Sequence, residues 1–177
     1  MANLHFPLQQ IKQFDVDLCA FCNRQSRSFT VRNLFRLASR LGDGVFWYVL
    51  MISFLLQDGY AALPAVLHML IAGGCGTLLY KLIKGKTLRP RPFNVYPAIQ
   101  CVGKTLDQFS FPSGHTLHAT VFCIVALAYY PGLFWLLVPF SAMVALSRPI
   151  LGLHYPSDVL AGAALGAMIA WLSFLFV

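Results

Sequence analysis

Three short polar segments of the sequence contain the residue types that could carry out chemistry. They lie at 84–92, 112–115 and 147–158, far apart along the chain. The side chains of interest are three cations, Lys84, Arg91 and Arg148, and two histidines, His115 and His154. Arginine and lysine bind phosphate oxygens, and arginine does so with two parallel hydrogen bonds. Histidine ionises near neutral pH, so this combination points to chemistry on a phosphate group.

Two histidines beside several cations suit phosphoryl transfer through a covalent intermediate. One histidine would attack phosphorus and the other would protonate the leaving oxygen, while the cations hold the remaining oxygens. The residue types alone do not decide which histidine attacks. Asp158 stands four residues after His154 and is placed to accept its ring N–H, which would fix the tautomer and stabilise positive charge on the ring. This spacing favours His154.

Ser113 and Gly114 open an apolar run that we expect to be a helix. The unpaired N–H groups at such a helix start favour an anion, and glycine lets the backbone approach it closely. The chain has six Asp and no Glu, so a carboxylate-rich metal site is hard to build, and the cations already supply positive charge. We therefore expect no metal and no other cofactor. Asp43 and Lys86 are further candidates for the rim of the site.

The composition places these residues in a membrane protein. The chain is 58% hydrophobic and 11% charged, whereas soluble chains carry about 25% charged residues. A net charge of +7 favours an anionic headgroup as partner or substrate. Nucleic acid is a poor alternative, because no basic segment is separable from the apolar runs. We expect one domain over 1–177, an all-α polytopic bundle of about five spanning helices.

The expected spans place the polar segments together. The spans are 45–56 (beginning nearer 41–44), 60–83, 116–130, 133–147 and 159–177. The third and fourth form a hairpin, so the polar loops at 85–112 and 148–158 should lie on one membrane face. Singly, each polar residue has an ordinary explanation, such as a charge flanking a span. Three patterns in the right order on one face favour a shared functional site.

The segment 1–41 is expected to lie at the bilayer surface. Phe14, Leu18 and Phe21 have the spacing of a short amphipathic helix, and 31–41 combines an apolar face with a basic stripe. That stripe is interpreted mainly as an interfacial anchor, with contact to anionic headgroups as the alternative. Cys19 and Cys22 form a CxxC without further zinc ligands nearby, which favours a structural role.

The three polar patterns resemble the signature of a known family. They read K-x6-RP from Lys84 to Arg91, PSGH ending at His115, and SR-x5-H-x3-D from Arg148 through His154 to Asp158. The chain is similar in this respect to type 2 phosphatidic acid phosphatases (PAP2), whose superfamily includes vanadium haloperoxidases. The resemblance covers about 60–177 and implies a helical core and metal-independent hydrolysis of phosphate esters.

The resemblance also implies roles for individual residues. His154 would be the nucleophile that forms a phosphohistidine, Asp158 its orienting partner and His115 the general acid. The phosphate-binding residues would be Lys84, Arg91, Ser113, Gly114 and Arg148. Arg89 does not fit the spacing of the first pattern, whereas Arg91 does.

Substrate and orientation are less constrained. Small bacterial members of this family act on undecaprenyl pyrophosphate, which we expect as substrate, or on phosphatidylglycerophosphate, phosphatidic acid or lipid-linked sugar phosphates. The expected location is the bacterial cytoplasmic (inner) membrane. The family's site usually faces outward, yet five spans would put all thirteen Lys/Arg on the site's side, which the positive-inside rule makes cytoplasmic. A lipid phosphotransferase and a non-enzymatic lipid-binding or transport protein remain as alternatives.

Overall fold

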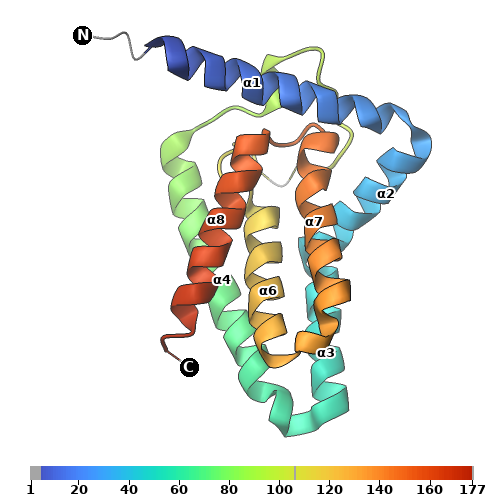
Figure 1. Ribbon diagram of the computed structural model, residues 1–177, viewed down its shortest axis with the longest axis vertical. Helices are drawn as coiled ribbons and strands as arrows, with labels where there is room; N and C mark the ends of the chain where they lie inside the picture. Colours follow the sequence, from blue (N-terminus) through green and yellow to red (C-terminus); the bar gives the residue numbers. More distant parts are fainter. Residues whose placement is uncertain (1–4, 106, 177) are drawn as a thin grey trace.

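The five expected spans correspond to five helices of the computed structural model, which describes residues 5–105 and 107–176 (Figure 1). They are α3 (Phe46–Asp58), α4 (Leu63–Thr87), α6 (Gly114–Tyr129), α7 (Phe134–Ile150) and α8 (Pro156–Ser173). Apart from one isolated bridge between Pro90 and Phe109, the described residues contain no β-structure. The prediction of an all-α membrane helix bundle is confirmed.

Three helical runs are long and apolar enough to cross a membrane: Phe29–Thr87, Pro131–Ile150 and Pro156–Ser173. The first run folds back at Gly59, whose φ of 56° favours glycine, so α3 and α4 run in opposite directions (Figure 1). α6 is a shorter apolar helix. α6 contacts α4, α7 and α8, so it forms the centre of the bundle.

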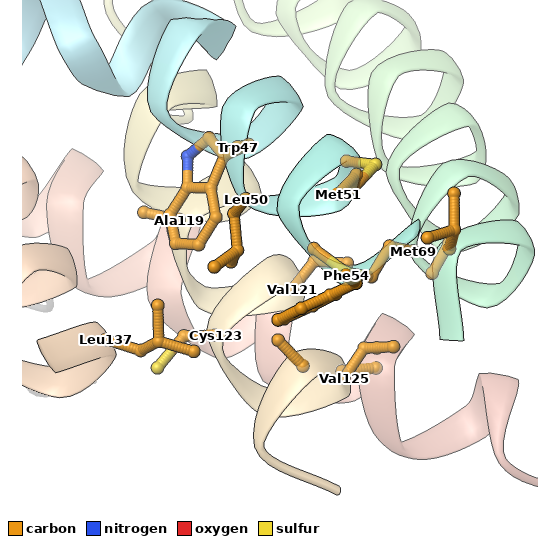
Figure 2. Packing of buried hydrophobic residues seen from close by; sticks show 14 of the residues in the cluster. Trp47, Leu50, Met51, Phe54, Met69, Ala119, Val121, Cys123, Val125 and Leu137 are labelled. Carbon is orange, nitrogen blue, oxygen red and sulfur yellow. The ribbon is translucent and has the colours of Figure 1, made fainter. Parts of the chain in front are cut away.

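The core of the bundle is made by side chains from α3, α4, α6 and α7, as Figure 2 shows. Trp47 and Phe54 of α3 meet Val121 of α6 and Met69 of α4 in this cluster. Small residues bring α8 close to α6. A Cβ atom on Gly162 would lie 2.5 Å from the carbonyl oxygen of Ser113, so this contact tolerates only glycine, as expected for close helix packing in lipid.

The N-terminal segment forms two helices with different positions. α1 (His5–Arg24) lies across one end of the bundle, and α2 (Phe29–Arg40) leads down from it (Figure 1). α2 continues through the π-helical turn Leu41–Val45 into α3, and it packs against α7. Ala38 and Ser39 are therefore buried. The segment 31–41 is thus part of the bundle wall on one side, which the amphipathic pattern alone did not indicate.

Both polar loops lie at the end of the bundle that α1 covers. The loop after α4 and the loop before α8 are joined directly, since Val102 N–H donates to the carbonyl of Leu151 at 3.1 Å. Arg91 spans the same two loops through the carbonyl of Leu153 at 2.8 Å. The prediction that the three polar patterns share one face is confirmed, and it brings the expected site residues within reach of one another.

Candidate active site

A cavity of about 380 Å³ lies between α3, α4 and α6 and reaches the polar loops. Six of the predicted site residues line it, namely Lys84, Arg91, Gly114, His115, Arg148 and His154. They come from α4, the following loop, α6, the end of α7 and the loop before α8. Positive charge and two imidazoles therefore converge on one cavity, although the residues are separated by up to seventy positions in the sequence.

His154 presents one ring nitrogen to this cavity in a defined state. Its Nδ1 lies 2.6 Å from the carbonyl oxygen of Ser110. A carbonyl only accepts hydrogen bonds, so Nδ1 carries the proton and Nε2 holds a lone pair. Nε2 faces Arg91, whose Nη1 lies 3.5 Å away. The ring is thus oriented as a nucleophile toward a guanidinium that can hold an anion.

The protonation of His154 is set by its surroundings. Burial, together with the positive charges of Arg148, Arg91 and Lys84, holds the pKa of His154 well below its usual range. The neutral ring is therefore the stable form in the unliganded site. A neutral imidazole is the form that can attack phosphorus, and the three cations lining the cavity help to keep Nε2 of His154 unprotonated.

Two of the cations are paired by a carboxylate that sequence reasoning did not single out. Asp107 accepts from Lys84 Nζ at 2.7 Å and from Arg91 Nη2 at 2.8 Å, and its carbonyl accepts from Arg91 Nε at 3.1 Å. Burial alone would raise the pKa of Asp107, but the hydrogen bonds and charges of Lys84 and Arg91 lower it below the ordinary value. The Asp107 carboxylate thus occupies donors that a phosphate would use.

Arg148 is buried and has a hydrogen-bond donor without a partner among the described residues. It is 1% exposed, and its Nη1 donates to Ser39 Oγ of α2 at 2.7 Å. Its Nε has no hydrogen-bond partner among the described residues. A buried unpaired donor is costly, and Arg148 lines the cavity, so an anion bound there would supply the missing acceptor.

His115 pairs with Asp43, which the sequence placed only at the rim. His115 Nε2 and Asp43 Oδ1 form a hydrogen bond, which leaves Nδ1 as the ring nitrogen available to a ligand. Asp43 lies in the π-helical turn Leu41–Val45, beside Gly44 with a φ of 130°. Single-turn π segments recur at functional sites, and here the distortion directs a carboxylate toward the cavity. Lys86, the other rim candidate, does not line the cavity.

The expected hydrogen bond between Asp158 and His154 is absent, which corrects the prediction. Asp158 Oδ2 lies 3.7 Å from His154 Nδ1, because the carbonyl of Ser110 takes the ring proton instead. Asp158 accepts from Arg89 Nη1 at 2.6 Å and from the backbone N–H of Tyr155 at 2.9 Å. Asp158 is thus bound within the turn that follows His154, and its carboxylate lies near the ring without a hydrogen bond to it.

Ser113 also differs from expectation. Its side chain is fully buried, bonds to Thr116 Oγ1 at 3.0 Å and does not line the cavity. Its backbone N–H is already used by the carbonyl of Asp158 at 3.1 Å. Ser113 thus joins the starts of α6 and α8, while Gly114 is the residue of this pair that borders the cavity.

Away from the loops, the cavity follows α4 into the bundle. Its wall includes Thr77, Gly73 and Leu70 of α4 and Phe122 of α6. Lys84 and Leu70 are fourteen residues apart on one helix, which corresponds to about 21 Å along the axis. The wall changes from cationic to largely apolar over this length, as a phosphorylated amphiphile would require.

The competition between Asp107 and a bound anion is testable. We expect Asp107→Asn to bind inorganic phosphate about tenfold more tightly, equivalent to about 1.4 kcal/mol, because Lys84 and Arg91 lose their internal anion. Calorimetric titration of the detergent-purified protein would measure this. Asp17→Asn, which removes an exposed carboxylate of α1, is the matched control. Equal or weaker phosphate binding by Asp107→Asn would contradict the competition.

The low pKa of His154 predicts how stability depends on pH. The unfolded chain binds a proton at His154 near pH 6.5, whereas the folded protein does so only at lower pH. Below pH 6.5 the unfolded state therefore holds more protons, and the free energy of unfolding falls as pH decreases, by up to about 1.4 kcal/mol per unit from this residue. His154→Asn, which can still donate to Ser110, should show a shallower decline between pH 7 and pH 5. Thermal unfolding at both pH values tests this, and parallel declines would refute it.

Several curated proteins are similar to part of the chain. An undecaprenyl-diphosphatase of Sulfolobus acidocaldarius is 40% identical over 89 residues, or 49% of this chain and 41% of that protein. The undecaprenyl-diphosphatase BcrC of Bacillus subtilis is 34% identical over 63% of this chain and 57% of its own length. A decaprenylphosphoryl-5-phosphoribose phosphatase of Mycobacterium tuberculosis is 38% identical over 63% of each chain. The match thus spans less than two thirds of each relative.

Two solved structures share the fold. A transmembrane PAP2 type phosphatidylglycerolphosphate phosphatase from Bacillus subtilis superposes with a TM-score of 0.73 over 94% of this chain and 86% of that chain, at 23% identity. Aquifex aeolicus LpxE superposes with a TM-score of 0.78 over 90% of this chain and 93% of that chain, at 24% identity. At these identities the likeness shows the fold.

The family model described as the PAP2 superfamily matches residues 61–177. That stretch contains all three polar patterns and the helices α4, α6, α7 and α8 that carry them. With its apolar helices, the chain is a multi-pass membrane protein. The match covers most of the sequence, and this chain belongs to the PAP2 superfamily.

Proposed function

We propose that the protein is a metal-independent lipid phosphatase that removes phosphate from a lipid phosphate or pyrophosphate through a phosphohistidine on His154. One observation carries the proposal. The unprotonated Nε2 of His154 faces buried cations at the polar end of a cavity that continues between apolar helices. A soluble phosphate ester would not need the apolar part, and a membrane transporter would not need an activated imidazole.

In the first step, His154 Nε2 attacks phosphorus and forms a P–N bond while the bond to the leaving oxygen breaks. Lys84, Arg91 and Arg148 hold the other phosphate oxygens, where charge accumulates in the transition state. The incoming phosphate replaces the Asp107 carboxylate as the acceptor of the hydrogen bonds from Lys84 and Arg91. The positive charge that develops on the His154 ring is stabilised by the Ser110 carbonyl at Nδ1 and by the Asp158 carboxylate nearby.

In the same step, His115 donates a proton to the leaving oxygen of the lipid. Its Nε2 proton bonds to Asp43, so Nδ1 is the donor, and the Asp43 carboxylate stabilises the protonated ring that this requires. Neutral His115 then takes a proton from water, which attacks the phosphohistidine. The P–N bond breaks, inorganic phosphate leaves and His154 returns to its neutral form.

The substrate we favour is undecaprenyl pyrophosphate, cleaved to undecaprenyl phosphate and phosphate in the bacterial cytoplasmic membrane. Two of the similar proteins are undecaprenyl-diphosphatases, and a cavity that follows α4 for about four turns suits the start of a long apolar chain. A phosphatidylglycerophosphatase B of Bacillus subtilis is also similar, 32% identical over 124 residues, so phospholipid phosphates belong in the same test.

The proposal is tested by phosphate release from the detergent-purified protein in the presence of EDTA. The lipids to compare are undecaprenyl pyrophosphate, phosphatidylglycerophosphate and phosphatidic acid. We expect release that EDTA does not reduce, and a loss of at least about 10⁴-fold in His154→Ala because the nucleophile is gone. Acid-stable phosphate on the His154→Ala protein, or equal turnover by it, would exclude His154 as the nucleophile.

Two other outcomes would change the function itself. Release that requires a second lipid as acceptor would indicate a phosphotransferase. No release from any lipid, by protein that still binds inorganic phosphate, would favour a binding protein.

The role of His115 as general acid predicts a dependence on the leaving group. The alkoxide that leaves a lipid monophosphate needs a proton, whereas p-nitrophenolate is a far weaker base and leaves without one. We expect His115→Ala to lose about 100-fold or more in kcat with phosphatidic acid and much less with p-nitrophenyl phosphate. Asp43→Asn should follow the same pattern more weakly. Equal losses with both substrates would show that His115 acts in binding.

A further inference from the structure

The inner face of α1 is polar and buried, which is unusual for a helix at a bilayer surface. Asp15, Cys19 and Asn23 follow one another at four-residue intervals, and they are 7%, 0% and 4% exposed. Two large apolar residues of the same helix, Phe14 and Phe21, are 68% and 58% exposed, whereas the smaller Val16 and Ala20 pack inward. α1 therefore presents its aromatic side chains outward and directs its hydrogen-bonding side chains to the protein.

Asp15 is bound to the turn that carries the proposed nucleophile. Its Oδ1 accepts the backbone N–H of Ser157 at 2.9 Å, and its Oδ2 accepts the Ser157 hydroxyl at 2.5 Å. Ser157 lies between His154 and Asp158. A single carboxylate of α1 therefore holds the 154–158 turn, which runs from the proposed nucleophile into the first turn of α8.

Asp15 also positions the cation that faces Asp158. Arg89 Nη2 donates to Asp15 Oδ2 at 2.7 Å, while Arg89 Nη1 donates to Asp158 Oδ1 at 2.6 Å and to Ser157 Oγ at 2.8 Å. Arg89 further stacks over the ring of Tyr155 at 4.0 Å. The guanidinium is thus shared between a carboxylate of α1 and a fully buried carboxylate of α8, and Asp15 is one of the groups that fix its position.

The neighbours of Asp15 on α1 bind the same region. Cys19 Sγ donates to the carbonyl of His154 itself at 3.6 Å. Asn23 Nδ2 donates to the carbonyls of Ile150 at 3.0 Å and Gln100 at 2.9 Å, and its Oδ1 accepts the Gln100 N–H at 2.8 Å. These contacts reach the backbone of the two loops that form the site and of Ile150, the last residue of α7. α1 thus acts on the loops as a unit.

We propose that Asp15 is a positioning residue of the active site, which holds the 154–158 turn and Arg89 so that His154 Nε2 stays directed at the phosphate. The proposal rests on the function proposed above for His154. Asp15 lies outside residues 61–177, where the superfamily match begins and ends, and it does not line the cavity. Its effect must therefore pass through the turn and through Arg89, and it concerns turnover more than substrate binding.

Two substitutions separate the contacts of Asp15. Asp15→Asn keeps a carbonyl oxygen for the Ser157 N–H but removes the negative charge opposite Arg89. Asp15→Ala removes both. Asp17→Asn is the matched control, since Asp17 is an exposed carboxylate on the same helix that bonds only to Gln13 among the described residues.

The experiment measures kcat and KM for undecaprenyl pyrophosphate in detergent micelles, normalised to folded protein. We expect Asp15→Ala to lower kcat by about 10- to 100-fold, the range for partners that orient a reacting group, with KM within about twofold of the unmodified protein. The kcat of Asp15→Asn should lie between those of Asp15→Ala and the unmodified protein, and the kcat of Asp17→Asn should equal that of the unmodified protein. In an Arg89→Ala background the loss caused by Asp15→Ala should shrink, because the two act through one network.

A second measurement does not depend on activity. Hydrogen exchange followed by mass spectrometry should show faster exchange across 151–158 in Asp15→Ala and no change in Asp17→Asn. Unchanged exchange in this segment overturns the proposal, as does a kcat per folded molecule equal to that of the unmodified protein, or fully additive losses with Arg89→Ala. If the unmodified protein hydrolyses no lipid, the proposed function fails, and the exchange data still decide whether Asp15 holds the turn.

Discussion

The burial of positive charge at one end of a membrane bundle is the constraint on which the rest of the structure depends. Arg91 and Arg148 are 2% and 1% exposed, and an unpaired buried ion costs several kcal/mol. Carbonyl oxygens of the loops and one carboxylate, Asp107, accept hydrogen bonds from Arg91. One donor of Arg148, its Nε, stays unpaired among the described residues. The site is therefore electropositive and incomplete, which is why we propose that a phosphate binds there.

A second charge cluster lies on the far side of the His154 turn, and the two clusters have different tasks. The inner one faces the cavity and contains the cations that we propose to bind phosphate. The outer one consists of Asp15, Arg89 and Asp158. Its two carboxylates accept hydrogen bonds from the backbone N–H groups of Ser157 and Tyr155. His154 lies between them and donates its Nδ1 proton to a carbonyl rather than to a carboxylate. A neutral acceptor leaves the ring less basic than a direct carboxylate partner would, which helps to keep Nε2 unprotonated among so many cations.

The membrane explains why the site has this shape. In lipid, backbone groups must be satisfied within the protein, so irregular segments gather at one end, where α1 covers them and supplies hydrogen-bond partners (Figure 1). Below the loops, α4 packs closely on α6 at Gly73, where a Cβ atom would lie 2.7 Å from the ring of Phe122, and both residues border the cavity. One element, α4, thus links the charged end of the cavity at Lys84 to its apolar wall.

The sequence by itself determined the membrane helices and the shared face of the three polar patterns, because hydropathy and short-range spacing are local properties. It also identified the cavity's cations and both histidines. Only the tertiary structure decided that Asp107 pairs those cations, that Asp43 pairs His115 and that Asp158 bonds Arg89 instead of His154. An i, i+4 spacing predicts a contact inside a helix, but His154 lies in the loop before α8, where the backbone turns its ring toward Ser110. Contacts across 40 to 140 residues, such as the one from α1 to the turn, leave no periodicity in the sequence, since they depend on how separate elements pack.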